Sequence, residues 1–134
     1  MLFLCQHAFA QTLTIINNSK ERVYYQVLGS NSGTCNGKFS SVTLSIEPSS
    51  RVVYKSAAEI DWSGKSGQNT VEYTGFKGMF TDPSGACTSE ASDIIGSCDH
   101  KQETTLNTAK CNGASGSLNL YWNNKNGNVT VRIK

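Results

Sequence analysis

The chain has 134 residues, a formal net charge of +2 and a charged fraction of 16%, which is below the ~25% usual for soluble domains. Ser, Thr, Asn and Gly are abundant instead, as in proteins built from short strands joined by polar turns. The low net charge and the runs of Val, Ile, Leu and Tyr argue against a disordered chain. No stretch reaches the ~18 apolar residues of a membrane-spanning helix, so we expect one domain with no transmembrane segment.

Residues 1–10 (MLFLCQHAFA) combine an apolar run with the small-residue pattern Ala8-Phe9-Ala10 ahead of Gln11. This pattern predicts the remnant of a secretory signal peptide, followed by a single secreted or periplasmic β domain over residues 11–134. The basic segment of such peptides is missing and the apolar run is short. A short buried strand at residues 1–10 is therefore the alternative.

The cysteine content also favours export. Without Cys5, four cysteines remain, namely Cys35, Cys87, Cys98 and Cys111. An even number in a small exported chain predicts two disulfides, and sequence cannot choose among their possible pairings. Our preferred pairing is Cys87–Cys98, which closes a short loop, with Cys35–Cys111. No C-x-x-C spacing occurs, so we predict neither a metal nor a cofactor.

Alternating apolar residues predict most of the strands in chain order. We expect a first hairpin from residues 12–16 and 22–28, joined by the Asn-rich turn 17–20. Further strands are expected over residues 42–46, 51–55 and 69–80, the last with a bulge at Gly75 or Gly78. Residues 57–68 read as a loop that starts with one helical turn.

The segment 81–116 shows no sustained period, and we expect a long loop stapled by disulfides, with a short helix over residues 88–95. A clear hairpin follows, with strands 118–122 and 129–133 and a turn at 123–127, and with Trp122 on the apolar face. These elements predict an all-β fold, a mostly antiparallel β-sandwich or partly open barrel of six to seven strands.

Residues 12–27 (TLTIINNSKERVYYQV) resemble the first hairpin of thaumatin-like and aegerolysin-like secreted β proteins. The resemblance implies an exported β-sandwich and ends after this segment. Thaumatin-like proteins have many more cysteines, and aegerolysins lack a cysteine-rich segment like this one. No functional residue is carried over.

Two groups of side chains are candidate binding residues. Tyr24, Tyr121 and Trp62 lie off the apolar stripes or in a loop, and exposed aromatic rings bind sugars and proteins. Asp93 and Asp99 belong to an acidic run suited to a cationic partner. This run lacks the spacing of a calcium loop. We therefore predict a binding protein for a glycan, a host protein or an enzyme that it inhibits.

The alternative function is a small secreted glycosidase-like hydrolase. Asp61 and Glu72 would be its paired carboxylates, and Trp62 its sugar platform. Basic residues are scattered along the sequence, so we do not expect nucleic-acid binding. Asn17 and Asn128 begin N-glycosylation sequons. The sequence leaves their use open, together with the oligomeric state.

Overall fold

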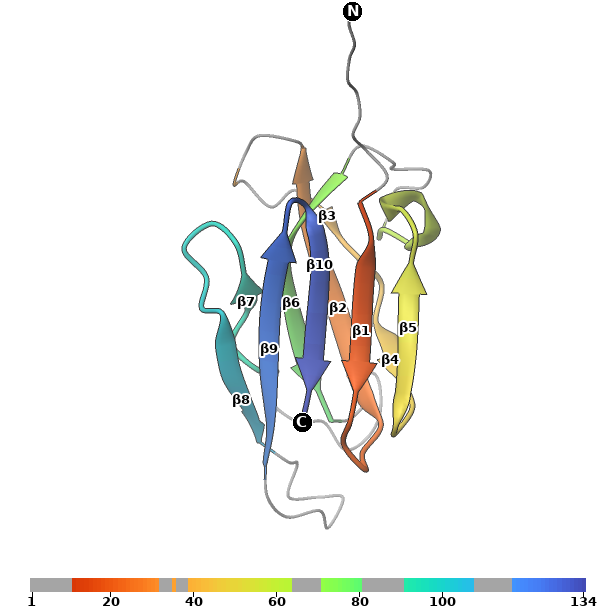
Figure 1. Ribbon diagram of the computed structural model, residues 1–134, viewed down its shortest axis with the longest axis vertical. Coiled ribbons are helices and arrows are strands. Elements are labelled where there is room, and N and C mark those ends of the chain that lie inside the picture. Colours follow the sequence, from red (N-terminus) through yellow and green to blue (C-terminus); the bar gives the residue numbers. More distant parts are fainter. Residues whose placement is uncertain (1–10, 32–34, 36–38, 64–70, 81–90, 108–116) are drawn as a thin grey trace, which may run out of the picture.

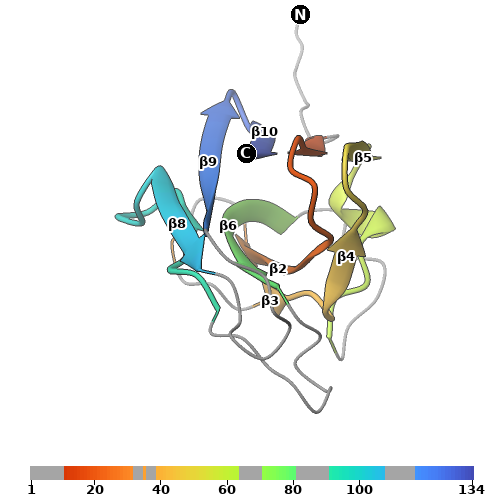
Figure 2. The ribbon, with the colours of Figure 1, turned by 90° about the horizontal axis from the view of Figure 1, so that it is seen from below.

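The computed structural model describes residues 11–31, 35, 39–63, 71–80, 91–107 and 117–134. Within these residues the chain forms ten strands and one turn of 3-10 helix, η1 (Ala57–Glu59). The strands make two sheets, which lie one behind the other in Figure 1 and appear as two layers in Figure 2. The predicted all-β, mostly antiparallel architecture is confirmed, although the strands are more numerous than expected.

Sheet A contains five strands in the order β5-β1-β10-β9-β8. Their bounds are β5 (Ser50–Tyr54), β1 (Leu13–Asn17), β10 (Asn128–Ile133), β9 (Ser117–Lys125) and β8 (Glu103–Asn107). β1 and β10 run parallel, and the other neighbours are antiparallel. This sheet forms the near layer in Figure 1.

Sheet B contains the remaining strands in the order β3-β2-β6-β7, with β4 also paired to β2. Their bounds are β3 (Phe39–Ser40), β2 (Val23–Asn31), β6 (Val71–Met79), β7 (Ile95–Gly96) and β4 (Leu44–Ile46). β6 is one long strand, as predicted. Its pairing with β2 slips between Leu28 and Gly29, opposite Thr74, so the irregularity lies next to the predicted Gly75.

The core fills the space between the two sheets. Period-two alternation buries every second side chain of a strand, and β10 follows it with Val129, Val131 and Ile133 inside. Sheet B adds Tyr25 and Phe76, whose rings stack at 5.2 Å. Trp122 is buried, as predicted.

The predicted first hairpin is wrong, because β1 and β2 belong to different sheets. The turn between them carries the chain across the sandwich, and Asn17 holds this crossing. Its buried side chain donates to the carbonyls of Glu21 (2.8 Å) and Glu47 (3.1 Å) and accepts from the backbone N–H and hydroxyl of Ser19. Alternation correctly predicts that Leu13 and Ile15 are the buried side chains of β1. It does not predict the partner strands, and β1 lies in sheet A while β2 lies in sheet B.

The last predicted hairpin is confirmed. β9 and β10 pair in register around Asn126 and Gly127. Both turn residues have positive φ angles, 56° and 88°, as a two-residue hairpin turn requires.

The prediction of a structureless loop over 81–116 is wrong in its middle. β7 and β8 lie there, and Ile95 and Leu106 are fully or nearly fully buried. Residues 91–94 are not helical and Ile95 is in a strand, so the predicted helix is also wrong there; residues 88–90 lie outside the described part. The backbone N–H of Gly96 donates to the Lys101 carbonyl, and the backbone N–H of Trp122 donates to the Gln102 carbonyl. Residues 95–102 therefore join the two sheets along one edge.

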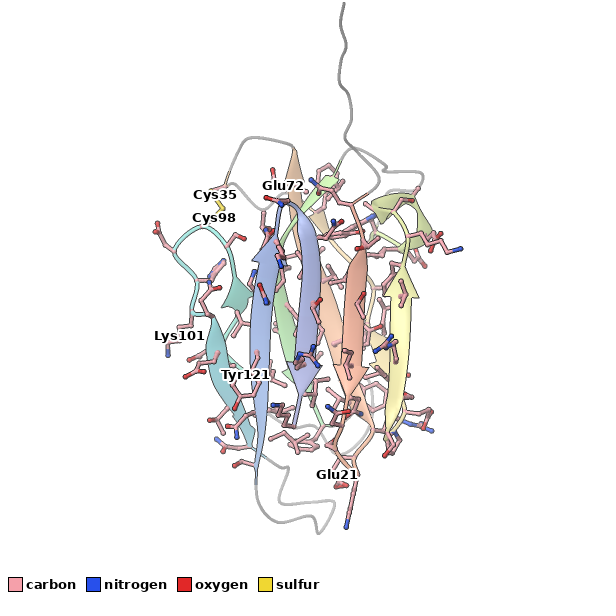
Figure 3. All side chains as sticks on the ribbon, in the orientation of Figure 1. Glu21, Cys35, Glu72, Cys98, Lys101 and Tyr121 are labelled. Atoms are coloured by element: carbon pink, nitrogen blue, oxygen red, sulfur yellow. A yellow bond between two sulfur atoms is a disulfide. The ribbon has the colours of Figure 1, made fainter. Side chains whose placement is uncertain are left out.

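The predicted disulfide pairing is also wrong. Cys98 pairs with Cys35, across 63 residues of sequence. The bond ties the connection between β2 and β3 to the turn that follows β7 (Figure 3). Cys87 and Cys111 lie outside the described residues. Cys35 and Cys98 pair because the fold brings their Cα atoms to 5.5 Å from each other. The spacing of cysteines in the sequence does not reveal this proximity.

Candidate functional site

Trp62, predicted as an exposed sugar platform, is 1% exposed. It follows η1, pairs with Ser41 in an isolated bridge, and donates its indole N–H to the Ala57 carbonyl at 2.8 Å. Its ring meets the Phe39 ring edge-on at 6.2 Å. Trp62 is therefore a core residue with a satisfied donor, and the prediction is wrong.

Tyr24 and Tyr121 are both half-buried, and they lie on opposite outer faces of the sandwich. Tyr24 belongs to β2 in sheet B and interacts with Arg22, which forms an ion pair with Glu47 at 2.8 Å. Side-chain hydrogen bonding to Tyr24, and then to Glu47, raises the pKa of the Arg22 guanidinium. Tyr121 belongs to β9 on sheet A, toward the lower end of the sandwich in Figure 3.

The outer face of sheet A is formed by the residues that alternate with the buried ones. Strand register brings five of them into one cross-strand row: Glu103, Tyr121, Arg132, Ile16 and Arg51. Neighbouring strands lie about 4.8 Å apart, so this row spans about 19 Å. We call it the Tyr121 row.

A shallow hollow of about 250 Å³ opens at the β8–β9 end of this row. It is lined by Glu103, Thr104, Thr105, Asn119 and Tyr121. The Thr105 hydroxyl donates to the Asn119 side-chain oxygen at 3.3 Å. The Lys134 ammonium lies 5.5 Å from the centre of the Tyr121 ring, within cation–π range. A carboxylate, an ammonium, hydroxyls, an amide and an aromatic ring therefore meet here. We call this the Tyr121 hollow.

A second hollow, of about 310 Å³, opens at the opposite end of the row. It is lined by Ile16, Asn18, Ser49, Ser50 and Arg51. Ile16 and Arg51 are members of the row itself, so the two hollows are the two ends of one surface. We call this the Arg51 hollow.

Sheet A gathers basic residues that are far apart in the sequence. Its five strands carry Arg51, Lys125 and Arg132 and one acidic residue, Glu103. Lys134 adds a fourth cation directly after β10. All five side chains are exposed. These cations are scattered along the sequence, and strand register places them on one sheet.

The predicted carboxylates do not meet at this surface. Asp93 is exposed and forms an ion pair with Lys101 at 3.0 Å. Asp99 is exposed beside the disulfide, with a φ of 75°. Asp61 follows η1, and Glu72 lies near the start of β6, toward the upper end of the view in Figure 3. Neither Asp61 nor Glu72 lines either hollow, whereas Glu103, which belongs to the acidic run of the sequence together with Asp93 and Asp99, lines the first.

The two sequons differ in access. Asn17 is fully buried, and its amide is held by the hydrogen bonds at the crossing, so the folded protein does not offer it to a glycosyltransferase. Asn128 is exposed in β10, where its side-chain oxygen accepts from the Thr12 N–H at 3.0 Å.

No protein-family model, curated protein or solved structure matches this chain. Across the described residues there is no cluster of three or more His, Cys, Asp or Glu side chains suited to a metal ion. In the same part of the chain, no helix has the length and apolar character needed to cross a bilayer. The Cys35–Cys98 disulfide is compatible with an extracellular or periplasmic protein.

Proposed function

We propose that this protein is an exported carbohydrate-binding protein whose ligand rests in the Tyr121 hollow. The observation that carries the proposal is the lining of that hollow, where the Tyr121 ring stands beside Asn119, Thr105 and Glu103. Carbohydrate sites pair an aromatic ring, which covers the apolar face of a sugar, with amides, hydroxyls and carboxylates that bind its hydroxyl groups. Export rests on the disulfide, since such bonds persist in oxidising compartments.

A carbohydrate suits this hollow better than a protein partner. Protein interfaces are anchored by large side chains that fill desolvated pockets. The Tyr121 hollow is shallow, and its lining exposes more polar than apolar surface. Glycoside hydrolysis normally uses two carboxylates about 5–9.5 Å apart, and Glu103 is the single carboxylate among the described residues that line the hollow. We therefore favour binding over hydrolysis.

The test is a glycan array that carries both neutral and acidic structures, followed by titration calorimetry on the best ligand. Tyr121→Ala should weaken binding by about tenfold or more, the usual cost of removing a central aromatic contact. Tyr24→Ala is the matched control, because it removes another half-buried tyrosine from the opposite outer face. Its affinity should equal that of the wild type.

Two results would contradict the proposal. One is an array on which the folded protein binds no glycan. The other is a ligand whose affinity falls with Tyr24→Ala and stays unchanged with Tyr121→Ala.

A further inference from the structure

We infer that the ligand is an acidic polysaccharide, laid across the strands of sheet A from the Tyr121 hollow over Arg132 to the Arg51 hollow. This inference rests on the proposed carbohydrate-binding function and names its ligand class. Three observations carry it: the cross-strand row, the two hollows at its ends and the charge of the face.

The first observation is length. The two hollows share one row, and Arg132 lies between Tyr121 on β9 and Ile16 on β1. The row spans about 19 Å from β8 to β5, which is longer than a single sugar. A ligand that fills both hollows must therefore be a chain of several sugar units running across the strands.

The second observation is charge. The strands of sheet A and the residue after β10 carry four positive charges and one negative charge, that of Glu103. The positive residues are Arg51, Lys125, Arg132 and Lys134. The net charge of this face is therefore +3, whereas the whole chain carries +2. The ion pairs among the described residues join Arg22 to Glu47 and Lys101 to Asp93. Neither Arg51 nor Arg132 has an acidic partner within the described residues. These guanidiniums are free to bind carboxylate or sulfate groups, which they match in geometry.

The third observation is the neutral polar surface beside the row. Thr14, Thr130 and Asn123 form a parallel register line, with Val53 at its β5 end. Hydroxyls and amides at this spacing can bind the hydroxyl groups of a sugar chain between its charged groups. A sugar polymer with regularly spaced acidic groups fits this mixture of cations and neutral polar groups.

Other polyanions fit this face less well. Nucleic-acid surfaces repeat aromatic platforms for successive bases, and the row holds Tyr121 as its one aromatic ring. A membrane surface would be met by exposed apolar side chains. Val53, at 46% exposure, is the one large apolar side chain that the described residues expose. Single-stranded DNA and acidic vesicles are therefore the competing ligands in the test.

The test compares polygalacturonic acid and dextran sulfate with neutral dextran, by titration calorimetry on the full chain. The first two probes separate carboxylate from sulfate as the bound group. Arg51→Gln/Arg132→Gln should weaken binding of the acidic polymer by about tenfold or more, since hydrogen bonds to charged groups are the strong ones. Higher salt should weaken wild-type binding in the same way.

The matched control is Arg22→Gln/Lys77→Gln, which removes one positive charge directly before β2 and one within β6, both outside sheet A. It should bind like the wild type. Arg132→Lys keeps the charge and should retain most of the affinity, and circular dichroism melts will verify that each variant folds. Short oligomers that fill one hollow should bind more weakly than chains that span both.

Several outcomes would overturn the inference. Equal losses in the control variant would mean that net charge alone attracts the polymer. Equal affinity for single-stranded DNA or for phosphatidylglycerol vesicles would mean a surface for polyanions in general. Binding of neutral dextran that depends on Tyr121 but not on the two arginines would refute the acidic ligand and leave the proposed function standing. If none of the three polymers binds, the acidic-polysaccharide inference fails, and the glycan array decides separately whether the proposed function stands.

Discussion

Asn17 shows how one buried polar side chain decides the path of the chain. It ends β1, and its four hydrogen bonds satisfy groups from Ser19, Glu21 and Glu47 at the point where the chain leaves sheet A for sheet B. A buried amide that satisfies several backbone groups is costly to replace, because those groups then lose their partners.

Asn17→Ala should therefore lower the free energy of unfolding by about 2–3 kcal/mol. Urea denaturation measures this loss. Asn18→Ala is the control, since Asn18 is exposed and exposed substitutions usually change stability by less than ~0.5 kcal/mol. Equal losses in the two variants would show that Asn17 does not hold the crossing.

Individual side chains were the least predictable part of the site. Trp62 lies in a segment expected to be a loop, which suggested an exposed ring. Its burial depends on η1 and β3, which place the Ala57 carbonyl and the Phe39 ring around it. Tyr121 could be selected because it alternates with Leu120 and Trp122. The sequence could not show that Glu103 and Arg132 lie beside Tyr121, because it does not reveal which strands pair or in which register.

At the scale of elements, alternation located most strands, including the five-residue β1 and β5, and missed β3, β7 and β8. β6, β9 and β10 have enough residues to display a period of two. β7 has two residues, and β8 buries one strongly apolar side chain, Leu106, among polar ones. Both strands are held by their neighbours β6 and β9, so tertiary pairing rather than local pattern makes them strands.

The Cys35–Cys98 disulfide joins the connection between β2 and β3 to the turn that follows β7. Cys35→Ser/Cys98→Ser should lower the free energy of unfolding by about 2–4 kcal/mol, because the bond closes a loop of 63 residues in the unfolded chain. Denaturation without reductant gives the loss.

Peptide mapping of a Cys87→Ser/Cys111→Ser variant provides the control. The Cys87→Ser/Cys111→Ser variant should still contain the Cys35–Cys98 disulfide. Finding Cys35 and Cys98 as free thiols in that variant would contradict the assigned pairing.

At the scale of the whole molecule, the two sheets are also joined by buried tyrosines. Tyr25 on β2 and Tyr54 on β5 share a hydrogen bond of 2.8 Å, and the Tyr73 hydroxyl donates to the Gln11 carbonyl at 3.0 Å. Burial, and for Tyr25 also the bond to Tyr54, raises the pKa of Tyr25 and Tyr73 well above the usual value. Each phenol therefore keeps its proton in the folded state at pH values where the unfolded chain loses it.

The raised pKa of both tyrosines in the folded state determines how stability changes at alkaline pH. Below pH ~10 both states are protonated and the contribution to stability is intact. Above it the unfolded state binds fewer protons, so stability should fall by about 1.4 kcal/mol per pH unit for each such tyrosine. Urea midpoints between pH 9 and 11 measure the slope. Tyr73→Phe should reduce this slope, and an unchanged slope in Tyr73→Phe would exclude Tyr73 as a source.

The placement of β1 between β5 and β10 also governs when the molecule can form. Leu13 pairs with Val129 in the parallel ladder, so the centre of sheet A joins residues more than a hundred positions apart. Contacts this distant in sequence slow folding, since a long loop must close before they form. The surface proposed for binding on sheet A therefore cannot form on a nascent chain that lacks residues 128–133, and we expect no ligand binding before synthesis has reached them.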